Sequence, residues 1–526
     1  MKKYILTIIS ALALTSCSDF LDRGPQDALS PSTFWITEAD ATLALTGCYR
    51  GFEDSWGIMY RDCTSDNAFS YHLAEGWRTI GDGTMTPGSP GSTFFDFVTI
   101  NRCNTFLENV GNVSFTTDGL KEAYISEVRF IRAYRYFIMT QLYGDVPLIK
   151  NTFATVQESY VPRDSRAVVE DFIITELKEL IPGLFDDPTA GHVTKGAGQA
   201  LLMRMYLYKG MYNEALATAK EIEGYDLLPS FESVFFLENK GSVESIFEYE
   251  HLANNASMDL TPFLPNSNGG WSSVVPTQSL VDAFEMANGL TIQEAQANGT
   301  YDPKNPYINR DPRLRQTIIY PGQNWEGAIY RSIEVGDSDH PLRENNSTKT
   351  GYNFKKYFNN LDQFPNRNFW NTSRSMILFR YAEVLLTIAE SNIELNQIND
   401  EMYDALDKVR VRAGMPSVDR AKYNTQASLR ELVRRERRVE FAFEGLRRYD
   451  ILRWGIALDV MNGDVFGAKQ GEILDAEYEN GDKMLNLAGD HFYVETRRYE
   501  NKHLLYPVPQ SAIDKNENLL PNNPGY

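Results

Sequence analysis

Apolar residues recur at three- and four-residue steps through much of the chain, the spacing of one face of an α-helix. The clearest case is residues 429–455, LRELVRRERRVEFAFEGLRRYDILRWG. Its apolar positions fall on one side of a helix and its arginines and glutamates on the other. We expect these charges to pair with one another and with neighbouring helices, for example Glu431 with Arg434 or Arg435, and Gly445 to break the helix. A phosphate or sulfate cradle is the alternative.

Three other segments share this periodicity and contain residues that typically begin or end a helix. They are residues 37–52, 127–149 and 166–180. Thr37 and Asp40 have the spacing of a capping box, and Ser165 stands where it would cap the third helix. Gly144 is expected to end the second.

Two stretches predict helix pairs. Residues 199–222, QALLMRMYLYKGMYNEALATAKEI, have the offsets of a tetratricopeptide repeat, in which Gly210 turns the chain and small alanines let two helices approach closely. Residues 381–412 form a looser copy. Because one pair cannot bury its apolar face alone, several pairs must stack. We therefore predict a helical scaffold made of residues 37–224 and 374–460.

Helical periodicity fails in residues 56–94 and 225–373, where Gly, Pro, Asn and aromatic residues accumulate. We read these as long loops carrying exposed aromatic side chains, with only short helices and strands. A C-terminal segment, residues 461–526, follows the scaffold. The predicted fold class is mostly α: a tetratricopeptide-like helical superhelix with a large, irregular, loop-rich insertion.

The formal net charge of −20 argues against a general affinity for nucleic acid or for anionic lipid headgroups. A neutral ligand fits this charge better than a polyanion does. The 29 Tyr, 29 Phe and 7 Trp offer many flat faces, most of which we expect in the core.

The N-terminus has the order of a secretory signal, with Lys2 and Lys3 before an apolar run and then the sequence LTSC. LTSC is similar to the bacterial lipobox, in which the cysteine carries the lipid. We therefore expect residues 1–17 to be a lipoprotein signal ending in its lipobox, and Cys17 to be lipidated. An ordinary signal with an incidental cysteine is the alternative.

Three further cysteines, Cys48, Cys63 and Cys103, lack the spacing of a zinc site. Buried thiols are the expectation, and a bridge between Cys48 and Cys103 stays open.

Several stretches resemble the SusD/RagB family. They are the CSDFLD sequence at the predicted mature end, LYGDVPL after the second helix, the DPR motif at Asp311 to Arg313, RERRVEFAFEGLRRYDILRWG, and YPVPQSAID near the C-terminus. The resemblance covers essentially the whole mature chain and implies one SusD-like domain over residues 18–526.

The resemblance implies an outer-membrane lipoprotein that captures a glycan or other nutrient, faces the exterior and passes its ligand to a TonB-dependent SusC-like transporter. In this family the region after the first helix carries part of the ligand site and often a DN pair, here Asp66 and Asn67.

Sugar binding by stacking needs aromatic faces with amide, carboxylate or guanidinium groups at their rims. The residues of the irregular segments that meet this description are Trp77 with Arg78, Trp271 with Asn268, Trp325 with Asn324, and Tyr301 with Asn305. Together with Asp66 and Asn67 they form the predicted ligand site, led by the three tryptophans, although core packing is the competing interpretation for each indole.

No catalytic or metal-binding motif such as HExxH or GxSxG is present, although the absence of a motif is weak evidence. The family resemblance implies a binding protein, and on that ground we expect no enzyme activity, no cofactor and no metal. Three alternatives stay open. A glycoside hydrolase needs only two carboxylates among 71 acidic residues. A helical-repeat adaptor would bind no sugar, and Asp302, Asn305, Asn309 and Asp311 offer oxygen ligands for calcium.

Overall fold

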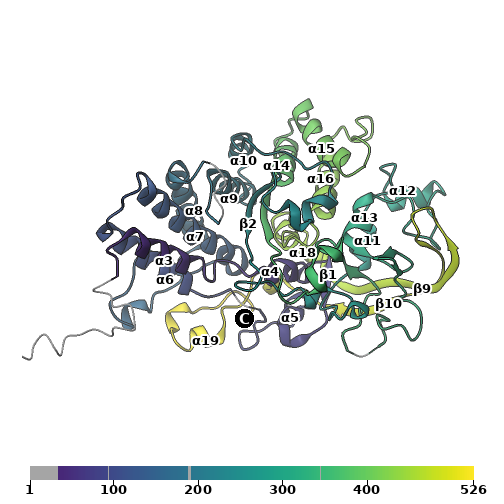
Figure 1. The fold of residues 1–526 in the computed structure, drawn as a ribbon, viewed down its shortest axis with the longest axis horizontal. Helices are drawn as coiled ribbons and strands as arrows, with labels where there is room; N and C mark the ends of the chain where they lie inside the picture. Colours follow the sequence, from purple (N-terminus) through teal and green to yellow (C-terminus); the bar gives the residue numbers. More distant parts are fainter. Residues whose placement is uncertain (1–33, 93, 187–190, 344) are drawn as a thin grey trace, which may run out of the picture.

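Stacked helices form one half of the molecule and an irregular, strand-containing portion forms the other (Figure 1). The computed structural model describes residues 34–92, 94–186, 191–343 and 345–526. The predicted signal and the lipidation site Cys17 lie outside them. The fold is mostly α, as predicted.

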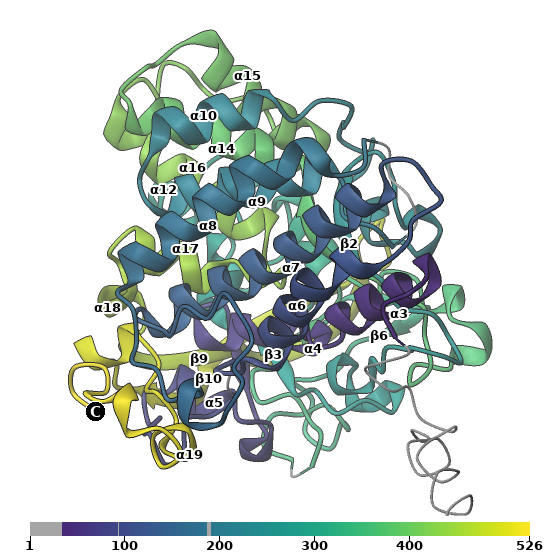
Figure 2. The same cartoon turned by 90° about the vertical axis from the view of Figure 1, so that its left-hand side faces the viewer.

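The scaffold helices stack in a chain of neighbours that joins two separated parts of the sequence (Figures 1 and 2). Its first part contains α3 (Glu38–Tyr49), α6 (Val98–Asn109), α7 (Leu120–Tyr143), α8 (Arg166–Leu180), α9 (Lys195–Tyr208) and α10 (Tyr212–Lys220). Its second part contains α14 (Tyr381–Glu394), α15 (Asp400–Arg412), α16 (Gln426–Glu440), α17 (Arg447–Arg453) and α18 (Ala457–Val460). α10 packs against α14, which confirms that the two predicted helix pairs stack into one scaffold.

Helix ends follow the predicted signals. Thr37 and Asp40 form a reciprocal capping box on α3, and the Ser165 hydroxyl accepts a hydrogen bond from the first turn of α8. α7 ends at Gly144, and Gly210, at φ +70°, turns the chain between α9 and α10. These positions are set by local backbone chemistry, which sequence reveals directly.

Residues 56–94 are not the long loop that the composition predicts. They contain most of α4 (Ser55–Tyr60), then β1 (Ala68–Ser70), α5 (Arg78–Gly81) and short 3₁₀ turns, and the side chains from Ser55 to Ser70 are nearly all buried. β1 pairs with β3 (Val274–Pro276), which ties this segment to the second irregular region. These elements are too short for periodicity to show in the sequence.

A long antiparallel hairpin in the C-terminal segment has no counterpart among the predicted elements. β9 (Gly463–Glu477) pairs with β10 (Lys483–Arg497) through several register shifts. Those shifts interrupt the alternation of apolar and polar residues by which a strand is recognised. The other described sheets are also two-stranded, for example β2 (Ser245–Tyr249) with β8 (Met376–Arg380).

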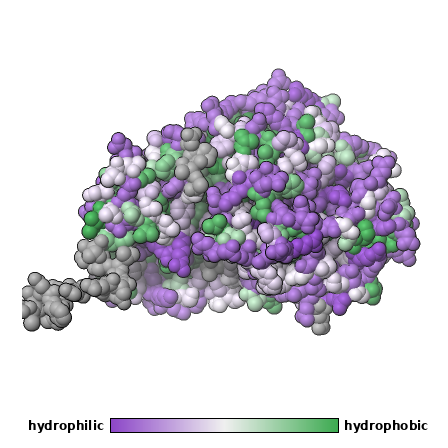
Figure 3. All heavy atoms as spheres, viewed as in Figure 1, coloured by the Kyte–Doolittle hydropathy of each residue, from purple (hydrophilic) through white to green (hydrophobic). Residues whose placement is uncertain are grey.

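Cys48, Cys63 and Cys103 are free and buried, as expected, and the Cys48 to Cys103 bridge is not formed. Burial raises the pKa of Cys103 well above its usual value, and a hydrogen bond with Cys48 adds to the effect. Among the described helices, none combines the length and the apolar character needed to cross a bilayer. Hydrophilic residues cover most of the face in Figure 3, and apolar ones are scattered over it in small groups.

The charges of α16 pair with other parts of the fold rather than along the helix. Glu440 binds Arg380 at 2.7 Å, Arg313 at 2.9 Å and also Arg412. Arg435, expected beside Glu431, instead binds Glu285. The prediction of contacts with neighbouring elements is confirmed, whereas the specific pair within the helix is wrong, because the arginines reach inward to buried carboxylates.

We call this cluster the α16 network. Its members are Glu244, Glu285, Asp311, Arg313, Lys356, Arg380, Arg410, Arg412, Glu436, Glu440 and Glu444. All are buried or nearly so, and they come from the scaffold, the irregular region and the DPR motif. A buried charge deprived of its partner is costly, so the network fixes how these parts fit together.

Substitution Glu440→Gln should lower the free energy of unfolding by about 3–5 kcal/mol, because it leaves three buried arginines short of one negative charge. Glu431→Gln, the same change on an exposed position of the same helix, should change it by less than about 0.5 kcal/mol. Urea denaturation of both variants measures this, and equal effects would contradict the role given to Glu440.

Candidate functional site

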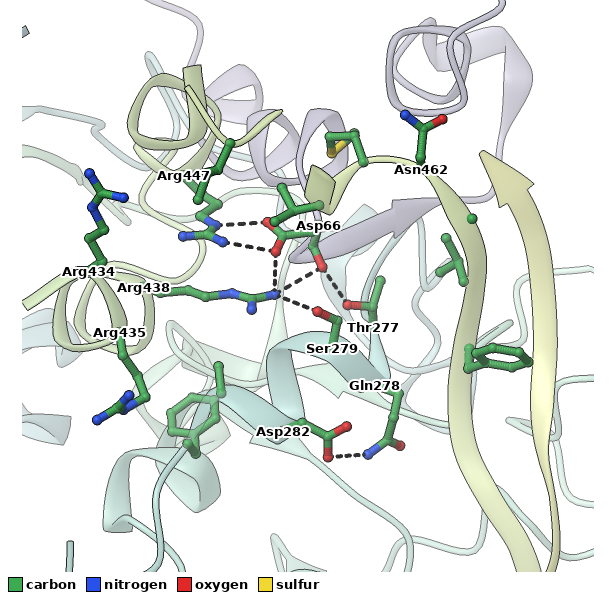
Figure 4. Close-up of a pocket in the computed structure, with 18 of the residues that line it drawn as sticks. Asp66, Thr277, Gln278, Ser279, Asp282, Arg434, Arg435, Arg438, Arg447 and Asn462 are labelled. Carbon is green, nitrogen blue, oxygen red and sulfur yellow. Dashed lines mark hydrogen bonds and ion pairs between the residues drawn. The ribbon is translucent and has the colours of Figure 1, made fainter. Parts of the chain in front are cut away.

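A cavity of about 670 Å³ lies where the scaffold meets the irregular region. Its walls come from α11 (Gln278–Ala283), α16, α17 and the bases of β9 and β10, with Asp66 reaching in from the segment before β1 (Figure 4). We call it the α16 cavity. It brings together residues more than three hundred positions apart in the sequence.

Asp66 is the charged centre of one wall. Arg447 binds both its carboxylate oxygens, at 2.8 and 2.9 Å, and Arg438 approaches at 2.9 Å (Figure 4). Burial would raise the pKa of Asp66, but the charges of Arg438 and Arg447 outweigh it and hold the pKa well below its usual range. Asp66 therefore stays ionised and positions two guanidinium groups.

Asn67 lies behind this wall and does not line the cavity. Its side-chain oxygen accepts a hydrogen bond from Arg438 Nε at 2.9 Å. Its backbone carbonyl accepts one from the backbone N–H of Thr277, and Thr277 caps α11. The DN pair thus fixes the arginines and α11, with only Asp66 facing the cavity.

Asp62 is hydrogen-bonded to the DN pair, Asp66 and Asn67, through the side chain of Asn67. It is fully buried, and one carboxylate oxygen accepts hydrogen bonds from Asn67 Nδ2 and from the backbone N–H of Phe443. Phe443 is held at φ +63°, an unusual conformation for a large side chain. The other oxygen has no hydrogen-bond partner among the described residues, and burial raises the pKa of Asp62 to about 7.

Stability should therefore depend on pH through Asp62. The folded carboxyl keeps its proton to about pH 7, whereas the usual pKa of an aspartate carboxyl in water is 3.8. The folded state binds more protons in this window, so the contribution of Asp62 to stability falls as pH rises through it. Asp62→Asn should be more stable than the wild type at pH 8, by on the order of 2–4 kcal/mol.

Urea denaturation at pH 5 and at pH 8 checks this prediction. The advantage of Asp62→Asn should grow between the two conditions. A variant that is equally or less stable than the wild type at pH 8 would show that Asp62 is ionised at little cost.

The opposite wall of the cavity is aromatic. Phe466 on β9 is 40% exposed, and its ring centroid lies 6.3 Å from that of His491 on β10. On the α16 side the guanidinium of Arg434 lies 5.0 Å from the centre of the Trp454 ring. The cavity thus has a flat apolar face opposite a charged wall.

Further polar groups line the α11 side. Gln278 donates to Asp282 at 2.8 Å, and burial raises the pKa of the Asp282 carboxyl (Figure 4). Asn462 stands at the entry to β9 (Figure 4). An aromatic face with guanidinium, amide and carboxylate groups around it suits a ligand that is flat on one side and rich in hydroxyl groups.

Two of the three predicted indoles are buried. Trp77 is 4% exposed and stacks on Tyr60, with ring centroids 5.6 Å apart. Trp325 is 6% exposed. The expectation that these indoles are exposed is wrong, because a tryptophan side chain gains most by packing its large apolar surface into the core.

Trp271 is 37% exposed, as expected, and Asn268 beside it is half-buried. Arg78 lies over the ring of Phe69, at 5.2 Å from its centre. Tyr301 and Asn324 are half-buried, and the carbonyl of Asn324 accepts a hydrogen bond from Arg315. These five residues do not line the α16 cavity.

The carboxylates considered as calcium ligands make contacts with different side chains. Asp311 binds Arg313 at 2.7 Å, and Asp302 accepts a hydrogen bond from Asn305 at 3.0 Å. In the part of the chain that the structure describes, no three His, Cys, Asp or Glu side chains are grouped to hold a metal ion.

Sequence reasoning missed Phe466, Asp282 and Gln278 as cavity residues. The arginines could have been found, since they stand out in residues 429–455. Phe466 gave no signal, because it is one of 29 phenylalanines and its exposure depends on a hairpin that the sequence did not reveal.

Comparison with known proteins gives consistent matches along the chain. A family model described as "SusD family" matches residues 231–526, and one described as "Starch-binding associating with outer membrane" matches residues 19–207. "SusD-like protein P2" of Formosa agariphila is 25% identical, and the match covers 100% of both chains. "Starch-binding protein SusD" of Bacteroides thetaiotaomicron is 23% identical over 100% of this chain and 99% of its own.

Among solved structures, the crystal structure of a "SusD-like carbohydrate binding protein" from Bacteroides fragilis NCTC 9343 superposes with a TM-score of 0.82. It is 30% identical, and the match covers 93% of this chain and 100% of that one.

Proposed function

This chain belongs to the SusD family, and on that premise we propose that it binds an oligosaccharide or polysaccharide nutrient in the α16 cavity without cleaving it. The relatives named as starch-binding and carbohydrate-binding proteins support the ligand class. One observation supports placing the ligand site in this cavity. The exposed ring of Phe466 lines the same cavity as polar side chains that are held in place by hydrogen bonds and ion pairs.

Binding in this cavity would need no covalent chemistry. A sugar ring would lie its apolar face on Phe466, and its hydroxyl groups would meet Arg438, Asp282 and Gln278. Arg438 is already held by Asp66 and Ser279, at 2.9 Å in each case, so it loses little freedom when a ligand arrives. Burial lowers the pKa of Arg438 to about 10, which still leaves it charged at neutral pH.

We place the protein on the outer membrane, facing the exterior and anchored through lipid on Cys17. Its partner would be a TonB-dependent SusC-like transporter that receives the glycan. The family model described as associating with the outer membrane supports this location. Trp271, exposed and next to Asn268, remains a proposed further glycan contact outside the cavity.

Phe466→Ala should weaken oligosaccharide binding about tenfold, since loss of one stacking contact costs on the order of 1–1.5 kcal/mol. Leu474→Ala removes a similarly exposed apolar side chain from the same strand outside the cavity and is the matched control. Isothermal titration calorimetry of both variants measures the effect. Equal affinities for the wild type and Phe466→Ala would place the site elsewhere.

Binding without cleavage predicts that the purified protein, incubated with the glycan it binds, yields no new reducing ends. A rise in reducing ends that Asp282→Asn abolishes would instead identify a glycoside hydrolase. Failure to bind any member of a broad glycan array would favour the helical-repeat adaptor.

A further inference from the structure

Two other tryptophans, Trp56 and Trp370, are exposed by 36% and 67%, and neither lines the α16 cavity. They are far apart in the sequence but are brought together by one pair of extended segments. Met258 and Thr372 exchange backbone hydrogen bonds of 3.0 and 3.1 Å, and the N–H of Leu260 donates to Phe369. Between these bonded pairs, Asp259 on one segment faces both Trp370 and Asn371 on the other.

Trp56 reaches the same residue from α4. Its indole Nε1–H donates to the backbone carbonyl of Asp259 at 2.7 Å. Its backbone N–H donates to the carboxylate of Asp54, which caps α4. Because its nitrogen is already bonded, the Trp56 ring is held in place with one part of its surface open to solvent. Trp56 is thus bonded to Asp259, and Trp370 belongs to the segment that pairs with Asp259.

Two amide groups lie next to Trp370 in this pair of segments. The Asn254 N–H donates to the side-chain oxygen of Asn371 at 2.7 Å, and the Asn371 amide donates back to the side chain of Asn254 at 2.6 Å. One oxygen of Asp259 accepts from Thr261 N–H. We call this set, with Trp56 and Trp370, the Trp56–Trp370 platform.

We propose that this platform is a second glycan-binding site, which holds a neutral polysaccharide chain while the α16 cavity holds another part of it. The inference rests on the proposed function. Aromatic faces bordered by amide and carboxylate oxygens match a sugar ring, which presents C–H groups on its faces and hydroxyl groups at its rim.

Charge selects among possible occupants. Asp54 and Asp259 both contact Trp56, so an anionic membrane surface or an acidic polysaccharide would be repelled there. A chain with no charge meets no such barrier.

A second site changes the affinity of the protein for long polysaccharide chains. When one polysaccharide engages two sites on one protein, the second contact forms within a complex already made, and its effective concentration is high. A short oligosaccharide that fills only the cavity gains nothing from the platform. The platform should therefore raise affinity for polymers and leave affinity for short fragments unchanged.

The test compares Trp56→Ala, Trp370→Ala and the double variant with the wild type. The probes are a soluble starch glucan, laminarin, and short oligosaccharides cut from the same polymers. Affinity for the polymer that the wild type binds should fall about tenfold in the double variant, whereas affinity for its short fragments should stay within twofold. Trp370→Phe, which keeps an aromatic face, should lose less than Trp370→Ala.

Tyr160→Ala, which removes an aromatic side chain exposed by 42% elsewhere on the surface, is the control and should behave as the wild type. Circular dichroism and thermal melting confirm that each variant folds. Polymer affinity that is unchanged in a folded double variant would overturn the platform and leave the cavity proposal standing. A wild type that binds neither probe nor any glycan of a wider array would overturn both.

Discussion

The buried charges of α16 constrain the whole structure. Arg313 and Arg380 are among the largest fully buried side chains, and each meets carboxylates from α16 or the segment just after it. Removing such a charged group from water costs several kcal/mol of folding free energy, and only close pairing with opposite charges offsets that cost. The fold is therefore restricted to arrangements in which the DPR motif, β8 and α16 come together, whatever their separation in the sequence.

That constraint also builds the cavity. The face of α16 that carries Arg434, Arg435 and Arg438 is turned toward α11, because the other face is held in the network. Asp66 then fixes Arg438 and Arg447 from the segment before β1. A ligand would meet polar groups whose positions are already set, and little ordering would be needed on binding. One face of α16 thus belongs to the buried charge network, and the other face lines the cavity.

Local signals in the sequence predicted the scaffold well. Caps such as Thr37 with Asp40, and breaks such as Gly144, act through neighbouring backbone groups and need no tertiary information. The irregular half was harder, since its elements are short and its strands pair across long separations. Asp66 was identified by family resemblance, and its role as an anchor for arginines emerged only when residues 438 and 447 were placed beside it.

The exposure of aromatic residues was the least predictable property. Trp77 and Trp271 both stand in polar, glycine-rich sequence, yet the first is stacked in the core and the second is partly exposed to solvent. Trp56 and Trp370, the two indoles of the proposed platform, come from α4 and from the segment before β8, more than three hundred residues apart. Composition alone cannot distinguish these cases, because exposure depends on what the rest of the chain places nearby.

The most direct test of the central claim is a crystal structure of the protein with the oligosaccharide that it binds in calorimetry. We predict a sugar ring lying on Phe466, with hydroxyl groups within hydrogen-bond distance of Arg438 or Asp282. Ordered sugar found elsewhere, with the α16 cavity filled by water alone, would contradict the account.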